Sequence, residues 1–201
     1  MAALIPHPHA LHSPLRQARR LCAMVLMLAA AALPAAAPAQ DDAASLERRV
    51  KAAFLYKFPA FIEWPEGAMA KPDVPLTIGV IGDDAMAGEL AQIAANRPAE
   101  GRPLVVKKLK SGEPLAGLTM LFIGREDAAR LPQIARAAQG QPVLIVSDSD
   151  GALQQGSIIN FVISGGRVRF EIALEGATAR GFRLSSRLLA LAQNVRTGGT
   201  P

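Results

Sequence analysis

Four short apolar runs, separated by helical patterns and polar turns, restrict the fold of this chain more than any other feature. The runs are residues 76–81, 104–109, 119–123 and 143–146. They lack the alternation of a half-exposed strand, which is typical of strands buried on both faces of a parallel sheet. Helices are expected between them, one carrying Met86, Leu90 and Ile93 and one over residues 126–138. We therefore predict an α/β fold of three layers, with a mainly parallel sheet flanked by helices.

The last third of the chain predicts a C-terminal β-hairpin over residues 157–174. Gly165 and Gly166 suit a two-residue loop, because glycine readily adopts the left-handed backbone that such a loop needs. This register pairs Ile159 with Ile172, Phe161 with Phe170 and Ile163 with Val168 on one apolar face that we expect to be buried. The opposite, largely polar face carries Asn160, Val162, Arg167, Arg169 and Glu171.

A terminal helix is expected after the hairpin. Ser185 is its predicted N-cap, because a serine hydroxyl accepts a hydrogen bond from a free amide of the first turn. The helical spacing then places Leu188, Leu191 and Val195 on the core.

The first forty residues have the pattern of an export signal. Arg16, Arg19 and Arg20 precede an apolar stretch at 21–33, and small residues at 37–39 suit a cleavage site. Prolines interrupt the stretch before the ~20 apolar residues that are needed to span a bilayer. We predict that residues 1–39 are a cleaved signal peptide and that residues 40–201 form one domain in the periplasm.

Charge and residue usage exclude several functions. Three of the 22 Lys and Arg and none of the 17 Asp and Glu lie in residues 1–39, so the rest carries a net charge of only +2. No nucleic-acid partner is therefore predicted. His7, His9, His12 and Cys22 are the chain's only histidines and cysteine. Residues 40–201 thus lack imidazole bases, thiolates, the usual zinc ligands and disulfides, and we expect no enzyme, cofactor or metal site.

Polar turns follow three of the predicted strands, at residues 82–84, 124–126 and 147–150. In a parallel sheet they gather beyond the carboxyl ends of the strands, where such folds bind ligands. One interpretation is a small-ligand crevice, with an anion held by Arg125 and helix N-termini. The other, more common for Asp and Ser, is that each turn only caps the element that follows. The candidate crevice residues are Asp83, Asp84, Arg125, Ser147 and Asp148.

An amphipathic first helix is predicted over residues 45–63, with its last turn kinked at Pro59. The helix and the residue after it carry more aromatic side chains than one buried stripe needs. Two interpretations stay open, a partner surface and a helix buried on two sides. The aromatic residues are Phe54, Tyr56, Phe58, Phe61 and Trp64.

Residues 50–65, VKAAFLYKFPAFIEWP, resemble the opening signature of the YfiR family. The resemblance continues in order through residues 76–82, 101–104, 121–124, 143–148, 156–161, 167–171 and 184–189. It implies a periplasmic, non-catalytic protein that binds the periplasmic part of an inner-membrane diguanylate cyclase and represses it, which limits cyclic di-GMP and biofilm formation. An outer-membrane lipoprotein sequesters the repressor in that system. Some members carry disulfides, which residues 40–201 cannot form.

Two functional hypotheses follow from the residues and the resemblance together. The first is a regulatory protein that contacts a cyclase or another membrane signalling protein, and a homodimer is compatible with it. Its candidate partner-binding residues are Arg167, Arg169, Glu171, Tyr56 and Trp64. The alternative is a periplasmic small-ligand sensor or binding protein that uses the strand-end crevice and has no cyclase partner.

Overall fold

The computed structural model describes residues 37–68 and 74–198. The fold below is that of the compact unit Asp42–Pro201. Nearly all of the predicted signal peptide lies outside the described residues. Within the residues that were described, no helix is long and apolar enough to cross a membrane.

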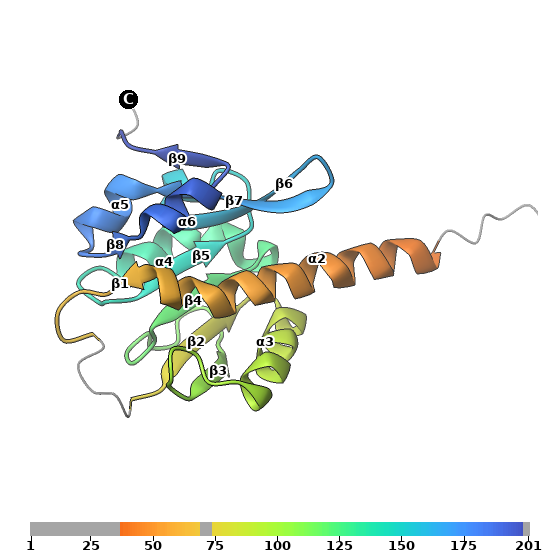
Figure 1. Cartoon of the computed structure of the whole chain (residues 1–201), viewed down its shortest axis with the longest axis horizontal. Coiled ribbons are helices and arrows are strands. Elements are labelled where there is room, and N and C mark those ends of the chain that lie inside the picture. Colours follow the sequence, from red (N-terminus) through yellow and green to blue (C-terminus); the bar gives the residue numbers. More distant parts are fainter. Residues whose placement is uncertain (1–36, 69–73, 199–201) are drawn as a thin grey trace, which may run out of the picture. The chain divides into compact units, whose positions relative to one another are not determined.

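One seven-stranded sheet organises the domain (Figure 1). Its strands are β2 (Leu76–Ile81), β3 (Leu104–Lys108), β4 (Met120–Ile123), β5 (Leu144–Ser147), β6 (Ile159–Ser164), β7 (Arg167–Ala173) and β9 (Asn194–Arg196). They lie in the order β3-β2-β4-β5-β6-β7-β9, and neighbours are parallel apart from the β6–β7 hairpin. The prediction of a mainly parallel sheet is confirmed, because all four apolar runs form strands of it.

Helices cover both faces of this sheet. On one face α2 (Ala37–Lys57) and α3 (Asp84–Asn96) pack against alternate strand residues such as Phe122 of β4. On the other face α4 (Leu131–Ala137) packs against Leu121 and Ile123 of the same strand. Successive side chains of a strand point to opposite faces, so one short apolar strand contributes side chains to the hydrophobic core on each face of the sheet. The predicted three layers are confirmed.

The remaining elements are short. They are the 3-10 helices η2 (Phe58–Phe61), η3 (Arg125–Arg130) and η4 (Ala152–Gln155), the helices α5 (Leu174–Ala179) and α6 (Ser186–Leu191), and a two-stranded sheet of β1 (Ile62–Glu63) and β8 (Arg183–Leu184). The helix predicted over residues 126–138 is therefore a 3-10 turn followed by α4, which has Pro132 in its first turn.

The predicted first helix is confirmed only as far as Lys57. Pro59 has no amide hydrogen to continue an α-helix, and the chain narrows into η2. Ile62 and Glu63 then leave the helix altogether and pair with β8. The prediction of a helix to residue 63 was wrong because strand pairing with a distant segment overrides the local pattern.

The hairpin has the predicted register, with Ile159 opposite Ile172, Phe161 opposite Phe170 and Ile163 opposite Val168. Ile163 is nevertheless 47% exposed, so the expectation of a wholly buried face was wrong at the tip. β5 reaches only to residue 160 of β6, and β9 covers only residues 171–173 of β7, so the tip extends past its neighbours (Figure 1).

Two other expectations for this region need correction. Asn160 lies on the predicted face, opposite Glu171, but it is buried there and does not face solvent, and its amide donates to Glu171 at 3.2 Å. Ser185 does cap α6, because its hydroxyl accepts from the amide of Leu188, which is buried. Leu191 is 59% exposed, however, and Val195 lies in β9, since α6 is only six residues long.

Candidate functional site

A cavity of about 260 Å³ lies beyond the carboxyl ends of β2, β4 and β5. The chain passes from β2 to β3 on one side and returns to β4 on the other, which makes this the point where the strand order reverses. Open parallel sheets bind ligands at such a point, because the loops diverge there and leave a crevice. The cavity is lined by Ala44, Glu47, Arg48, Lys51, Gly82, Asp83, Met86, Arg125, Glu126 and Asp148.

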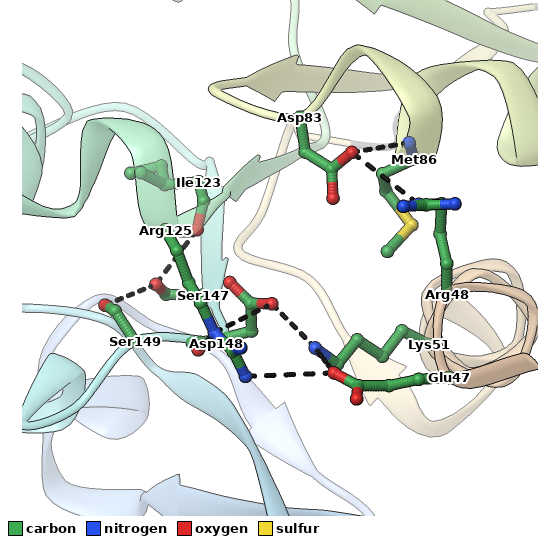
Figure 2. A network of polar contacts seen from close by, with 10 residues as sticks. All are labelled: Glu47, Arg48, Lys51, Asp83, Met86, Ile123, Arg125, Ser147, Asp148 and Ser149. Carbon is green, nitrogen blue, oxygen red and sulfur yellow. Dashed lines mark hydrogen bonds and ion pairs between the residues drawn. The ribbon is translucent and has the colours of Figure 1, made fainter. Parts of the chain in front are cut away.

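A buried lysine from α2 forms the centre of the charge network (Figure 2). The side chain of Lys51 is 4% exposed, and its Nζ lies 2.5 Å from Glu47 Oε1 and 2.6 Å from Asp148 Oδ2. It lies next to Ala52 of the core on a helix that also buries Leu55. A buried ammonium group is tolerated only when it is paired, so these carboxylates are what allow Lys51 to lie here.

Arg125 extends the network from the turn after β4. Its Nε donates to the backbone oxygen of Asp148 at 3.0 Å and lies 3.7 Å from Asp148 Oδ2. Its Nη2 lies 3.7 Å from Glu47 Oε1. The side chain is 63% exposed, so Arg125 connects α2 to the β5 turn while one side of its guanidinium faces solvent.

Asp83 follows β2 and is the N-cap of α3. Its Oδ1 accepts from the amide of Met86 at 2.8 Å and lies 3.9 Å from Arg48 Nε. The adjacent turns are in close contact, because the amide of Gly124 donates to the oxygen of Ile81 at 2.8 Å. The capping interpretation thus holds for Asp83, which also lines the cavity.

Ser147 is the last residue of β5, Asp148 follows it, and the two side chains have different roles. Ser147 is fully buried, donates to the oxygen of Ile123 at 2.9 Å and contacts the hydroxyl of Ser149 at 3.0 Å (Figure 2). It holds β5 to β4 and does not line the cavity. Asp148 does line it, and its Oδ1 is buried without a hydrogen-bond partner.

The structure brings together three of the five predicted crevice residues, Asp83, Arg125 and Asp148. Ser147 has a structural role, and Asp84 points away, with an 87% exposed side chain that pairs with Lys108 at 3.4 Å. That these residues bind a ligand stays a prediction.

Sequence reasoning missed the contribution of α2, which comes from Glu47, Arg48 and Lys51. The available signal was the i, i+4 spacing of Glu47 and Lys51 together with the position of Lys51 inside an apolar run.

The candidate partner-binding residues occupy separate parts of the domain. Arg167 and Arg169 are exposed on β7, and across the described residues the side chain of neither has a hydrogen bond or ion pair. Glu171, further along β7, accepts from Asn160. Tyr56 donates to the oxygen of Pro98 at 2.9 Å, and Trp64 packs edge-on against Phe182 with ring centres 5.3 Å apart.

The aromatic side chains of α2 and η2 contact two sides of the domain. Phe54 and Phe58 pack on Phe161 and Phe170 of the hairpin, whereas Tyr56 reaches toward Pro98 on the α3 side. This arrangement supports the interpretation of a helix packed on two sides.

The sheet order and the crevice define an α/β domain of the doubly wound type. The chain matches the YfiR/HmsC-like family over residues 48–193 and belongs to that family. The resemblance inferred from the sequence motifs is thereby confirmed. Membership supports a periplasmic regulatory protein of the cyclic di-GMP signalling type rather than a catalyst.

Solved structures show the same fold in distant proteins. One is the ABC domain from Streptococcus pneumonia in complex with L-Trp, with a TM-score of 0.51, 12% identity and 75% of this chain covered. Another is a conserved domain protein from Vibrio cholerae O1 biovar El Tor, with a TM-score of 0.53, 12% identity and 74% covered. The chain spans 60% of the length of each. At this identity the likeness shows the fold alone.

Proposed function

We propose that this protein is a periplasmic repressor that keeps an inner-membrane diguanylate cyclase inactive by direct contact, and so limits cyclic di-GMP and biofilm formation. The family match over residues 48–193 is the observation that carries this proposal, because it spans most of the described domain. The proposal assigns the protein no reaction of its own. An outer-membrane lipoprotein that sequesters the repressor is a second partner in this scheme.

The projecting hairpin supports the proposal as the contact surface. Arg167 and Arg169 are exposed on one face of β7, and Ile163 is 47% exposed on the other face of the hairpin. Arginine is enriched at the centres of protein interfaces, since its planar guanidinium makes paired, charge-assisted hydrogen bonds to carboxylates. The complementary surface on the cyclase would carry acidic residues beside an apolar patch.

A deletion strain tests the proposal. Removing the gene should raise cellular cyclic di-GMP and biofilm mass, because an unrepressed cyclase makes more product. Expression of the wild-type protein from a plasmid should restore the original level, and cell fractionation should recover it from the periplasm. Unchanged cyclic di-GMP in the deletion strain would refute repression of a cyclase.

The crevice favours a second candidate function, a periplasmic sensor or binding protein for a small ligand. The observation behind it is a cavity at the strand-order reversal that contains the buried charged groups of Lys51 and Asp148. Unchanged cyclic di-GMP in the deletion strain would leave this candidate ahead. A neighbouring transporter or receptor gene would point the same way, whereas a neighbouring cyclase gene would support the first candidate.

A further inference from the structure

Every positively charged side chain that lines the crevice has a carboxylate next to it, but not every carboxylate has a cation next to it. Each of its cations lies within 4.0 Å of a carboxylate, with Arg48 next to Asp83 and both Lys51 and Arg125 next to Asp148. The carboxylates keep acceptor capacity to spare. Among the described residues Glu126 has no ion pair or hydrogen bond of its side chain, although it lines the cavity.

Asp148 supplies the most specific observation. The residue is 8% exposed, and while Oδ2 is held by Lys51, Oδ1 is buried without any hydrogen-bond partner. Figure 2 shows its carboxylate beside the open space that separates it from Asp83. A carboxylate oxygen that has left water without gaining a donor costs free energy, and a ligand that brings an N–H group would recover it.

The whole lining favours a positively charged ligand. Its ionised side chains are three cations, Arg48, Lys51 and Arg125, and four carboxylates, Glu47, Asp83, Glu126 and Asp148. The excess is therefore one negative charge in a recess where water screens charges less than at an open surface.

We propose that the crevice binds a small organic cation that carries a primary ammonium group on a short aliphatic chain. An ammonium group offers three donors and no acceptor, which suits the unused oxygens of Asp148, Asp83 and Glu126. Met86 and Ala44 give the cavity an apolar part for the methylene groups. Its volume of about 260 Å³ lies below the range of drug-sized pockets, so the ligand is small. This inference rests on the second candidate function, the ligand sensor.

Three probes test the class of ligand directly: cadaverine, glutarate and Mg²⁺. Calorimetric titration of the purified full domain with cadaverine should show saturable binding, and cadaverine should raise the midpoint of thermal unfolding, because a ligand of the native state stabilises it. Glutarate, which also has five carbons but whose two terminal carbons are carboxylates, should do neither, and nor should Mg²⁺. Binding of glutarate would overturn the inference and leave a sensor of anions. Binding of Mg²⁺ alone, or of no probe, would overturn it as well.

Matched variants test whether the crevice is the site. Glu126→Gln should weaken cadaverine binding about threefold, the loss expected for one exposed charge pair, whereas Glu113→Gln removes the same charge elsewhere on the surface and should leave binding unchanged. Asp148→Asn should weaken it more than about tenfold. Equal weakening by Glu126→Gln and Glu113→Gln would show non-specific attraction and would contradict the proposal. Because Glu126 is exposed, its variant remains informative even where Asp148→Asn impairs folding. None of these outcomes depends on cyclic di-GMP, so this inference and cyclase repression can fail separately.

Discussion

The ammonium nitrogen of Lys51 lies 2.6 Å from a carboxylate oxygen of Asp148, and the two side chains are only 4% and 8% exposed. Lys51 belongs to α2 and Asp148 follows β5, so the pair joins segments 97 residues apart in the sequence. It fixes the first helix to the carboxyl edge of the sheet and forms one wall of the crevice. This pair of buried charges is therefore one of the contacts that hold α2 against the sheet.

Removing one partner of this pair should be costly. Lys51→Met keeps most of the side-chain volume but leaves the buried carboxylate of Asp148 with only the longer 3.7 Å contact to Arg125, and we expect the free energy of unfolding to fall by about 3–5 kcal/mol. Urea denaturation followed by circular dichroism measures the change. Lys110→Met alters an exposed lysine and should stay within about 0.5 kcal/mol of the wild type. Equal stability of the two variants would show that Asp148 is well solvated without Lys51.

The close approach of two turns at the crevice requires glycine at position 124. An added β-carbon there would overlap the carbonyl oxygen of Gly82, a backbone atom that cannot rotate away as a flexible side chain could. Gly124→Ala should destabilise the domain by about 1–3 kcal/mol, the usual cost of overpacking. Gly88→Ala is the matched control, because its β-carbon meets nothing within 4 Å and alanine favours the helix α3. It should raise stability by up to about 1 kcal/mol, and a cost similar to that of Gly124→Ala would argue against the predicted clash.

Packing of η2, which directly follows α2, on the hairpin depends on Phe58. Its ring is buried, with centres 5.3 Å from Phe170 and 5.8 Å from Phe161. Phe58→Ala should lower the free energy of unfolding by about 3–5 kcal/mol, because it removes a large buried side chain and leaves a cavity. Leu191→Ala should change it by no more than about 0.5 kcal/mol, since Leu191 is 59% exposed. A larger loss at Leu191 would restore the sequence-based expectation that it lies in the core.

Arg180 has a partly buried guanidinium group whose loss of water is poorly offset by hydrogen bonds. Burial lowers the pKa of its guanidinium, its Nη1 has no partner, and its Nη2 makes a long 3.4 Å hydrogen bond to the oxygen of Ala135. Arg180→Met retains the apolar contacts of the stem and removes the unsatisfied donor, so stability should rise by about 1 kcal/mol. Thermal and urea unfolding measure this change. A loss of more than about 1 kcal/mol would mean that the guanidinium has a partner that the structure does not show.

Much of the fold could be predicted from local sequence rules. The glycine pair at 165–166 fixed a two-residue loop, and the strict period of two in a strand then determined every pair down to Ile159 and Ile172. Buried strands of a parallel sheet have all-apolar sequences, which is why β2, β4 and β5 were recognisable. Errors appear where exposure depends on how far neighbouring strands reach, as at Ile163.

The candidate site could be predicted only in part, for a related reason. Asp83, Arg125 and Asp148 follow strands, and the carboxyl ends of parallel strands necessarily meet at one edge. Lys51 reaches that edge from a helix whose direction across the sheet is set by packing of Phe54 and Phe58 on the distant hairpin. No local pattern encodes that direction, so the spacing of Glu47 and Lys51 could indicate a buried ion pair but could not place it at the crevice.

Repression by contact is tested most directly by a strain whose only copy of this gene carries Arg167→Ala and Arg169→Ala. The quantity to measure is its cellular level of cyclic di-GMP. Both side chains are exposed and without partners among the described residues, so the variant should fold with a loss of less than about 0.5 kcal/mol, which circular dichroism can verify. The matched control, Arg136→Ala with Arg187→Ala, removes the same charge from exposed positions on α4 and α6. Our account predicts that cyclic di-GMP rises toward the deletion level in the hairpin variant and stays at the wild-type level in the control. A wild-type level in the folded hairpin variant, in a background where the full deletion raises it, would contradict this surface as the point of contact.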